Sequence, residues 1–355
     1  MNRLPFVILI LLFSISACKN DPTALNKEHT RGLQDTIGFA QYAWQMDSIY
    51  KRLKIEDTPN NFNWKAAICP HDDYKYAGAL YYKSLQGINA NTIIMIGVAH
   101  KARNFDLKDK LVFGDFNYWK SPYGQLPVSG LNGEILKNMD NSSYVLHDDM
   151  QALEHSLEAI VPFLNKKNPD VEIIPILVPY INYSDLDRIS TELARAVHKV
   201  MLEHNLAYGK DLAIVISNDA VHYGDTDWGG KNMAPYGVDS PGTLKARTHD
   251  KMLIEKYLSG TLDMHKIQSF LFDTTYEDNY QEYKWVWCGR YSVPFGLATA
   301  NKLNLLINKL PLSGTELAYS SSIDHKLIAV EDIRMGTTAI ATQNHWVAYT
   351  SIKYE

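Results

Sequence analysis

The segment Asn91-Thr92-Ile93-Ile94-Met95-Ile96-Gly97-Val98, followed by Ala99-His100, decides the fold class. Its apolar residues do not alternate with polar ones, so it predicts a short strand that is buried on both faces. Similar runs occur at 65–70, 171–178 and 211–217. Helical periodicity separates these runs, over about 77–86, 152–165 and 184–203. Strands that alternate with helices predict an α/β fold with a largely parallel or mixed central sheet flanked by helices.

The rest of the chain extends the same pattern. The spacing of apolar residues predicts an amphipathic helix over 38–54 and a second helix over 292–307, and β-like runs lie near 315–322 and 336–350. No linker rich in Pro, Gly or Ser follows residue 60, and no internal repeat is present. We therefore expect one compact domain over 37–355.

The first residues have a separate role. Arg3 precedes an apolar run that is too short to span a bilayer, which is typical of an export signal. The run ends in Ile15-Ser16-Ala17-Cys18, which resembles the bacterial lipobox. The resemblance implies that a signal peptide of residues 1–17 is removed and that Cys18 is lipidated. We expect an exported bacterial lipoprotein that is anchored to a membrane and faces the periplasm or lies on the cell surface. Residues 18–36 would form a polar tether between the lipid and the domain.

Composition excludes several classes of protein. Of 355 residues, 35 are Lys or Arg and 40 are Asp or Glu, giving a formal net charge of −5. An acidic balance argues against electrostatic binding of nucleic acid, and 46% apolar content is ample for a core. The expected partners are a small molecule or a peptide, with the membrane contacted through the lipid anchor only. The sequence carries no signal for an oligomeric state.

Histidines follow three of the predicted strands. His71 comes after the run ending at Pro70, His100 after the run ending at Val98, and His222 after the run ending at Ser217. Because parallel strands end on the same edge of a sheet, where ligands bind, we expect these imidazoles to meet there. Neutral imidazole and thiolate favour iron, copper or zinc. A histidine that is not a ligand can move protons.

The three cysteines are widely spaced. If Cys18 is lipidated, Cys69 and Cys288 remain. Cys69 lies two residues before His71, so it points either towards the site or into the core. Cys288 lies in Trp285-Val286-Trp287-Cys288-Gly289-Arg290, a pattern that indicates a buried strand end, where Gly289 permits a turn or a close backbone approach. In an oxidising compartment Cys69 and Cys288 could instead form a disulfide, which would abolish a metal site.

The segment Glu154-His155-Ser156 contains the residue types of a hydrolase catalytic triad, but adjacent residues do not have the geometry that a triad requires. Neighbours in sequence on a helix do not face one another, so this segment does not form a catalytic triad. We expect His155 to lie beside the substrate or to orient a ligand.

Taken together, these residues resemble the Memo family, whose bacterial members are called AmmeMemoRadiSam system protein B. Six matching segments run in order from about 65 to 340. They are Pro70-His71-Asp72-Asp73-Tyr74, Gly97-Val98-Ala99-His100, the segment 119–124, the segment 154–164, Ser217-Asn218-Asp219-Ala220-Val221-His222 and Cys288-Gly289-Arg290.

The resemblance implies a fold similar to the LigB-type (class III) extradiol non-haem iron dioxygenases. It implies iron or copper, with zinc as a third candidate, held by His71, His100 and Cys288. Asp219 and His222 would line the same pocket, with His222 as acid/base. Further residues expected in the pocket or behind the ligands are Asp72, Asp73, Tyr74, His155 and Arg290.

Two features depart from the family pattern. Asp72-Asp73 replaces an Ala-Gly pair, which adds two carboxylates beside the first ligand. This pair favours a harder metal or a cationic ligand, or else forms a solvated acidic loop. Export is the second departure, because it separates this chain from a cytosolic radical-SAM partner.

Two functions remain open from the sequence. The first is a metal-dependent oxidoreductase with dioxygenase-like activity. The second is a non-catalytic lipoprotein that binds a peptide or small ligand in the same pocket.

Overall fold

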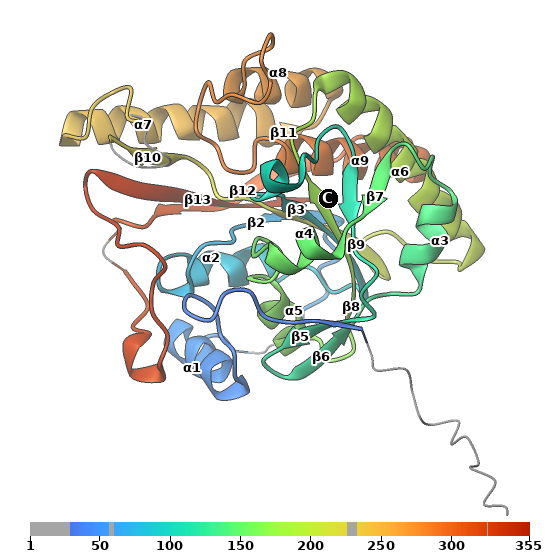
Figure 1. The fold of residues 1–355 in the computed structure, drawn as a ribbon, viewed down its shortest axis with the longest axis horizontal. Helices are drawn as coiled ribbons and strands as arrows, with labels where there is room; N and C mark the ends of the chain where they lie inside the picture. The colour runs from blue at the N-terminus through green and yellow to red at the C-terminus, as the bar shows by residue number, and fades with distance from the viewer. Residues whose placement is uncertain (1–28, 57–59, 226–232, 325) are drawn as a thin grey trace, which may run out of the picture.

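A mixed sheet separates two layers of helices in the computed structural model, which describes residues 29–56, 60–225, 233–324 and 326–355 (Figure 1). In these residues, ten strands form the sheet in the order β11-β12-β13-β2-β9-β3-β8-β4-β7, with β10 paired to β13. Their bounds are β2 (Ala66–Cys69), β3 (Thr92–Val98), β4 (Leu111–Phe113), β7 (Tyr144–Leu146), β8 (Glu172–Val178), β9 (Leu212–Ser217), β10 (His222–Gly224), β11 (Gly260–Thr261), β12 (Ser313–Ser321) and β13 (His345–Tyr354).

The centre of the sheet is parallel. β2, β9, β3 and β8 are neighbours that run in the same direction, whereas β13 is antiparallel to β2 and β4 is antiparallel to β8. The carboxyl ends of β2, β9 and β3 therefore lie side by side at one edge. The predicted α/β fold with a mixed central sheet is confirmed.

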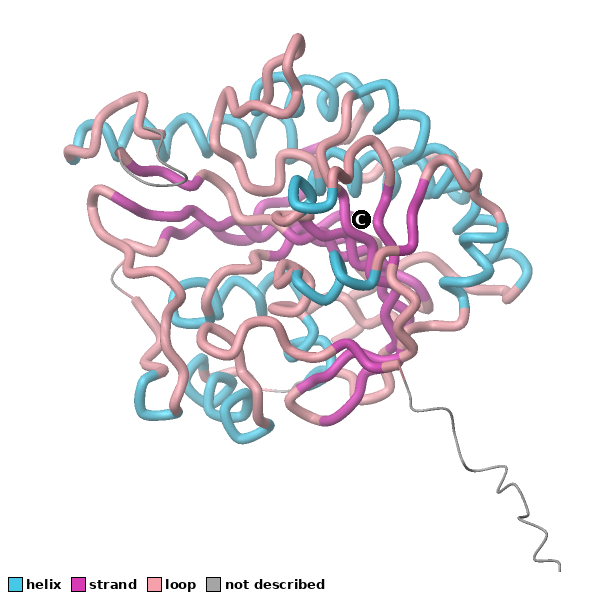
Figure 2. Tube along the Cα trace, in the orientation of Figure 1, coloured by secondary structure: helices cyan, strands magenta, loops and turns pink. Residues whose placement is uncertain are grey.

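Helices cover both faces, as Figure 2 shows in cyan around the magenta strands. Along β3, Ile94 and Ile96 face one apolar cluster and Ile93 and Met95 face the other, so both sides of the strand are buried. The first layer contains α3 (Leu131–Lys137), α6 (Tyr183–Glu203), α7 (Ser240–Leu253), α8 (Met264–Thr274) and α9 (Ser292–Asn308). The second contains α1 (Ala43–Leu53), α2 (Tyr74–Leu85), α4 (Asp148–Leu153) and α5 (Val161–Lys167).

Three predicted elements have different limits in the structure. The helix expected over 38–54 begins only at Ala43. The strand expected over 336–350 runs instead over His345–Tyr354, and the residues before it form a loop. The single helix expected over 152–165 is two helices, α4 and α5, because Glu154 adopts an extended backbone (φ −99°, ψ 127°) and ends the first.

The N-terminal predictions concern residues that the structure mostly leaves undescribed. The signal peptide, Cys18 and the tether as far as residue 28 lie outside the described residues. Residues 29–36 lie against the domain: β1 (Thr30–Arg31) pairs with β5 (Tyr118–Ser121), which pairs with β6 (Gly124–Pro127). No helix in the described residues has both the length and the apolar character that crossing a bilayer requires.

Candidate functional site

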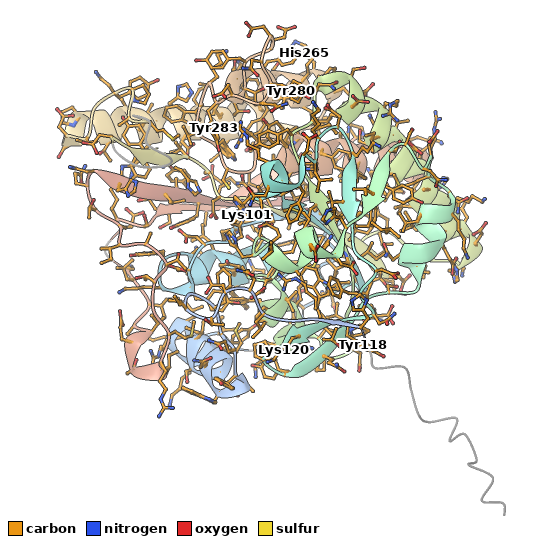
Figure 3. All side chains as sticks on the ribbon, in the orientation of Figure 1. Lys101, Tyr118, Lys120, His265, Tyr280 and Tyr283 are labelled. Atoms are coloured by element: carbon orange, nitrogen blue, oxygen red, sulfur yellow. The ribbon has the colours of Figure 1, made fainter. Side chains whose placement is uncertain are left out.

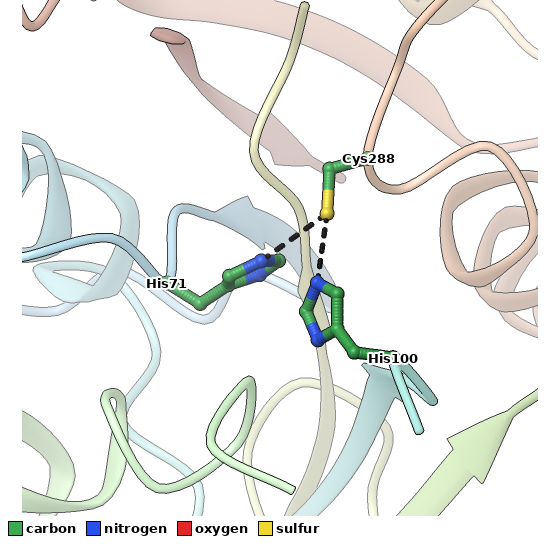
Figure 4. A group of neighbouring side chains, drawn as sticks. All are labelled: His71, His100 and Cys288. Atoms are coloured by element: carbon green, nitrogen blue, oxygen red, sulfur yellow. Dashed lines mark hydrogen bonds between the residues drawn. The ribbon is translucent and has the colours of Figure 1, made fainter. Parts of the chain in front are cut away.

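The edge formed by β2, β3 and β9 brings two histidines and a cysteine together. His71 follows β2, His100 follows β3, and Cys288 comes from the loop before α9. The Cys288 Sγ lies 3.1 Å from His100 Nε2 and 3.4 Å from His71 Nε2 (Figure 4). The loop of Cys288 is held by the residues after β9, since Cys288 N donates to Ala220 O at 3.2 Å and Gly289 N donates to Asp219 O at 3.3 Å.

Gly289 lets this loop approach closely. A Cβ added at Gly289 would lie 2.1 Å from Asn218 Oδ1, so any side chain there would displace the loop that carries Cys288. The structure has both roles that the sequence left open for Gly289, because it lies in a turn, in which Arg290 N donates to Trp287 O at 3.3 Å, and it also approaches Asn218 closely.

Ser217 fixes the ring of His71. The Ser217 hydroxyl lies 2.7 Å from His71 Nδ1 and donates its hydrogen to Ser156 O at 2.7 Å. Because a hydroxyl has one hydrogen, Ser217 Oγ must accept from His71 Nδ1–H. The lone pair of His71 is therefore on Nε2, which is the atom that faces Cys288.

Glu154 fixes the ring of His100 in the same way. Its carboxylate accepts from His100 Nδ1 at 2.8 Å and from the His100 backbone N–H at 2.6 Å. The Ser156 N–H also donates to it, at 2.9 Å. A carboxylate on one imidazole nitrogen aims the other nitrogen at a metal and raises its basicity. The His100 Nε2 thus faces the same point as His71 Nε2 and Cys288 Sγ.

The donor set fits a metal ion. The ligand atoms of His71, His100 and Cys288 all lie within 4.8 Å of one another. Tetrahedral geometry with ordinary metal–nitrogen and metal–sulfur bonds places N and S about 3.5 Å apart, close to the separations found here. Two imidazoles and a thiolate suit iron, copper or zinc better than magnesium or calcium.

The charges of these groups depend on one another. Burial raises the pKa of the Cys288 thiol, but the His100 and His71 imidazoles outweigh burial and lower that pKa to about 5. Burial lowers the pKa of His100, but Glu154 and the Cys288 thiolate outweigh it and raise that pKa well above its usual value. Burial lowers the pKa of His71 to about 4. Without metal, the cluster is a thiolate–imidazolium pair beside a neutral imidazole.

Asp219 and His222 stand next to this cluster. Asp219 Oδ1 accepts from the His71 backbone N–H at 3.0 Å, and Asp219 Oδ2 lies 3.4 Å from His71 Nε2 and 4.0 Å from His222 Nε2. Burial raises the pKa of Asp219 well above its usual value, and burial lowers the pKa of His222 to about 4. His222 is therefore neutral near pH 7, the form in which an imidazole has a lone pair that can accept a proton.

The His155 ring packs against His71 and His100, and it is not part of the group of donor atoms that contains Cys288 Sγ. Its ring stacks on His100 with centroids 4.7 Å apart and meets the edge of His71 at 5.8 Å. The side chains of His100, Glu154 and His155 form a second group whose donor atoms could hold a metal. Because Glu154 already accepts from His100, we assign His155 a supporting position.

The acidic pair makes specific contacts. Asp73 is 1% exposed and accepts from Thr338 N at 2.6 Å. Asp72 bonds through Oδ2 to the Tyr349 hydroxyl and through Oδ1 to the Asp73 N–H at 2.7 Å. The interpretation of Asp73 as part of a solvated acidic loop is wrong, because its carboxylate fastens one loop to another.

Tyr74 and Arg290 lie behind the site. Tyr74 is buried in the core and donates to Ala159 O at 2.6 Å. The Arg290 guanidinium is buried over the rings of Tyr283 and Tyr291, at 3.7 and 4.6 Å. Both residues support the walls of the site.

Cys69 is a core residue. It is buried in β2, within the cluster that faces α1 and α2, and both Cys69 and Cys288 are free thiols. The alternative of a Cys69–Cys288 disulfide is wrong, because Cys288 turns towards the histidines instead.

A cavity of about 640 Å³ opens beside the cluster. His71, His100, His155, His222 and Cys288 line it, together with Asp72, Asp73 and Asp219. Lys101 and Tyr283, labelled in Figure 3, also line it. A cleft of this size with convergent polar groups is typical of a small-molecule site.

Sequence reasoning missed several residues of this site. Glu154 and Ser217 orient the histidines, and Tyr349 and Thr338 bind the acidic pair. Glu154 is adjacent to His155 in a segment that the resemblance quoted, which was a usable signal. No signal in the sequence pointed to Thr338 or Tyr349, because they lie more than 260 residues from their partners.

Comparisons with known proteins show which family the chain is similar to. The family model for Memo-like proteins matches residues 40–334. A MEMO1 family protein of Pyrobaculum aerophilum is 27% identical over 162 residues, covering 44% of this chain and 52% of its own length. One from Pyrococcus horikoshii is 25% identical over 184 residues, covering 50% and 59%.

The chain thus spans about half the length of the curated relatives that it matches. The family model covers most of the chain, including every residue of the His71, His100 and Cys288 cluster. This chain belongs to the Memo-like protein family.

Proposed function

We propose that the chain holds one iron or copper ion through His71, His100 and Cys288, and that it performs redox or dioxygenase-like chemistry on a small molecule in the adjacent cavity. One observation carries this proposal: His71 Nε2, His100 Nε2 and Cys288 Sγ face one point, while Ser217 and Glu154 hold the opposite ring nitrogens. A site fixed from behind in this way is typical of metal centres.

The bound ion would supply electron transfer and Lewis acidity. His222, neutral and beside the cavity, would accept a proton from the substrate at an imidazole nitrogen. Asp219, between His71 and His222, would hold the orientation of both rings. The cavity walls would limit the access of water to the reacting groups.

The donor set also bears on which reaction to expect. Extradiol dioxygenases of the non-haem type use two histidines and a carboxylate, whereas the third donor here is a thiolate. The Glu154 carboxylate is occupied by His100 Nδ1, and Asp219, whose Oδ2 lies 3.4 Å from His71 Nε2, accepts from the His71 backbone N–H through Oδ1. We therefore expect no cleavage of catechol rings at ordinary enzymatic rates, and a catechol turnover assay under air tests this.

Metal analysis tests the proposal directly. The full chain would be purified without oxygen or chelators, beside His71→Ala, Cys288→Ser and the matched control Cys69→Ser. We expect about one iron or copper per chain, lost in the first two variants and kept in the control. Absence of metal from the unmutated protein, even after anaerobic reconstitution with Fe(II), Cu(I) or Zn(II), would overturn the redox function.

A second function is supported by the carboxyl groups around the cavity, whose ionised form a bound cation would favour. Asp35, Asp72, Asp73 and Asp219 line it, and among its described lining residues Lys101 is the single lysine and there is no arginine. Such a lining favours a cationic small molecule or peptide, bound without turnover. Ligand binding that persists after complete chelation would favour this function over the first.

We further propose that the protein is an exported lipoprotein held by Cys18, which the sequence Ile15-Ser16-Ala17-Cys18 supports. Cys18→Ser should move the protein from the detergent phase to the aqueous phase in a detergent-partition assay. Detergent partitioning that is unchanged in this variant would contradict lipidation.

A further inference from the structure

Two short segments outside the family match form part of the cavity rim. Residues 34–37 precede the matched region 40–334 and residues 338–341 follow it, yet both line the cavity. We call these two segments the terminal rim. They lie at opposite ends of the sequence, so their meeting at the site is a property of this fold.

The C-terminal half of the terminal rim is fastened to the first turn of α2. Thr338 donates to Asp73 Oδ2 from its backbone N at 2.6 Å and to Asp73 from its hydroxyl at 3.2 Å. The Tyr76 hydroxyl donates to Ala339 O at 3.2 Å and accepts from Ala341 N at 3.2 Å. Asp73, which departs from the family pattern, thus has a structural use: it fixes this segment over the cavity.

The N-terminal half is fastened as firmly. Glu158 accepts from Gln34 N at 2.8 Å and from Asp35 N at 3.0 Å. Asp35 Oδ1 accepts from the Ile37 N–H at 2.6 Å. It is also bound to the chain just before the C-terminal half, because Gly336 N donates to Ile37 O at 2.9 Å. The terminal rim is therefore a built part of the site.

The rim exposes apolar side chains towards solvent at the cavity mouth. Ile37 is 50% exposed, Ile340 is 77% exposed, and Leu153 of α4, which lines the same cavity, is 42% exposed. Single exposed apolar residues are ordinary. Three that line one cavity, above an interior of histidines and carboxylates, mark a surface that binds an apolar group.

We propose that the terminal rim selects an amphipathic small molecule, whose polar head reaches the metal cluster and whose apolar chain or ring lies on Ile37, Ile340 and Leu153. The cavity, at about 640 Å³, falls within the range of roughly 300–1,000 Å³ that holds such ligands. This inference rests on the proposed metal site.

Two imidazoles that differ only in their tail test the inference. The full chain is loaded with Cu(II), and the affinities of 1-methylimidazole and 1-hexylimidazole are measured by the shift of the copper absorption band. Both heads coordinate a metal equally well, so the affinity ratio reports on the tail. The same ratio is measured in Ile37→Ser, in Ile340→Ser and in the control Leu310→Ser, which alters a side chain 65% exposed outside the cavity lining.

We expect the hexyl compound to bind at least about tenfold more tightly in the unmutated protein, since its additional methylenes leave water when they lie on the rim. Each isoleucine variant should reduce this ratio severalfold, and Leu310→Ser should leave it unchanged. If copper binds but the two imidazoles have equal affinities, the rim inference is overturned and the metal site is not. The same conclusion follows if Leu310→Ser reduces the affinity ratio as much as the isoleucine variants do. Failure to bind either copper or 1-methylimidazole would overturn the metal site and the inference with it.

Discussion

Cys288 is the residue whose chemistry depends most on its neighbours. A buried thiol is ordinarily protonated, but here two imidazoles lie within 3.4 Å of the sulfur and lower its pKa to about 5. The usual value is near 9.0, so the fraction of thiolate is large at neutral pH and is lost as the pH falls through about 5. A thiolate, not a thiol, is the nucleophile and the metal ligand.

This charge state predicts a pH profile for alkylation. In the metal-free full chain, the rate at which iodoacetamide labels Cys288 should be nearly constant from about pH 9 to about pH 6 and should fall as the pH drops through about 5. Labelling of each cysteine is measured by peptide mass spectrometry. Burial raises the pKa of Cys69 well above its usual value, so Cys69 should stay unlabelled in the folded protein.

His100→Ala is the informative variant in that experiment. Removing the imidazole should move the midpoint of Cys288 labelling upwards, towards the usual thiol pKa. A midpoint near pH 9 in the unmutated protein, or one that does not move in His100→Ala, would contradict the thiolate–imidazolium pair.

Glu154 acts on the cluster through His100, and this role can be separated from a general effect of losing a carboxylate. Glu154→Gln keeps the shape of the side chain but removes the charge that holds His100 Nδ1–H. We expect the affinity for metal to fall about 10- to 100-fold, measured by competition with a chelator of known affinity. The control is Glu134→Gln, which removes the same kind of contact, 2.7 Å to His204, at an exposed site away from the cavity.

At the scale of elements, the break between α4 and α5 is what places Glu154. Arg31 holds this break: its guanidinium donates to Gln151 O at 2.8 Å, to Glu158 Oε2 at 2.6 Å and to Glu154 O. It also stacks on Trp119 at 4.3 Å. Arg31 is buried, with 1% of its surface exposed. Its contacts join β1 to the segment between α4 and α5, where Glu154 orients His100.

Arg31→Met should therefore destabilise the protein strongly. Removing one partner of a buried ion pair costs about 3–5 kcal/mol, because the other charge is left buried. The free energy of unfolding in urea measures this cost. In Arg31→Met combined with Glu158→Gln, part of the loss should be recovered. Additive losses in the double variant would show that the two side chains are not coupled.

The hydrogen bond between Thr338 and Asp73 leads to a prediction about the stability of the terminal rim. Asp73→Ala removes the acceptor of the Thr338 N–H, a contact to a carboxylate worth about 1.5–3 kcal/mol. Amide hydrogen exchange at Thr338 should become about tenfold to a hundredfold faster, while the metal content stays the same. Asp332→Ala, at an exposed pair with Arg52, is the control that should leave exchange at Thr338 unchanged.

These elements also show what the sequence could reveal. β3, β8 and β9 are apolar on both faces, so their place inside a sheet and the meeting of His71 and His100 at its edge could be predicted. The break at Glu154 could not, because the apolar spacing of a helix continues through it. From the sequence, residues 29–36 are predicted to be a polar tether, because the burial of Arg31 depends on partners more than 85 residues away.

At the scale of the whole molecule, the metal ligands join parts of the chain that are far apart in sequence. His71 and His100 follow β2 and β3, two parallel strands that pair with opposite sides of β9, whereas Cys288 lies 188 residues beyond His100, in the loop before α9. An unfolded chain does not hold these three groups together. An ion that binds only the folded form should therefore stabilise the entire domain by mass action.

The expected gain is about 2.7 kcal/mol when free metal is about 100 times Kd. For a chain of this size, this gain in the free energy of unfolding corresponds to a rise of roughly 4 °C in Tm. Calorimetry of the metal-free protein, with and without added Zn(II), measures the rise, and Zn(II) avoids redox damage during heating. Cys288→Ser should show no rise, whereas Cys69→Ser should keep it, because both variants remove a buried thiol and only the first removes a ligand. Equal rises in the two variants would place the bound metal elsewhere on the molecule.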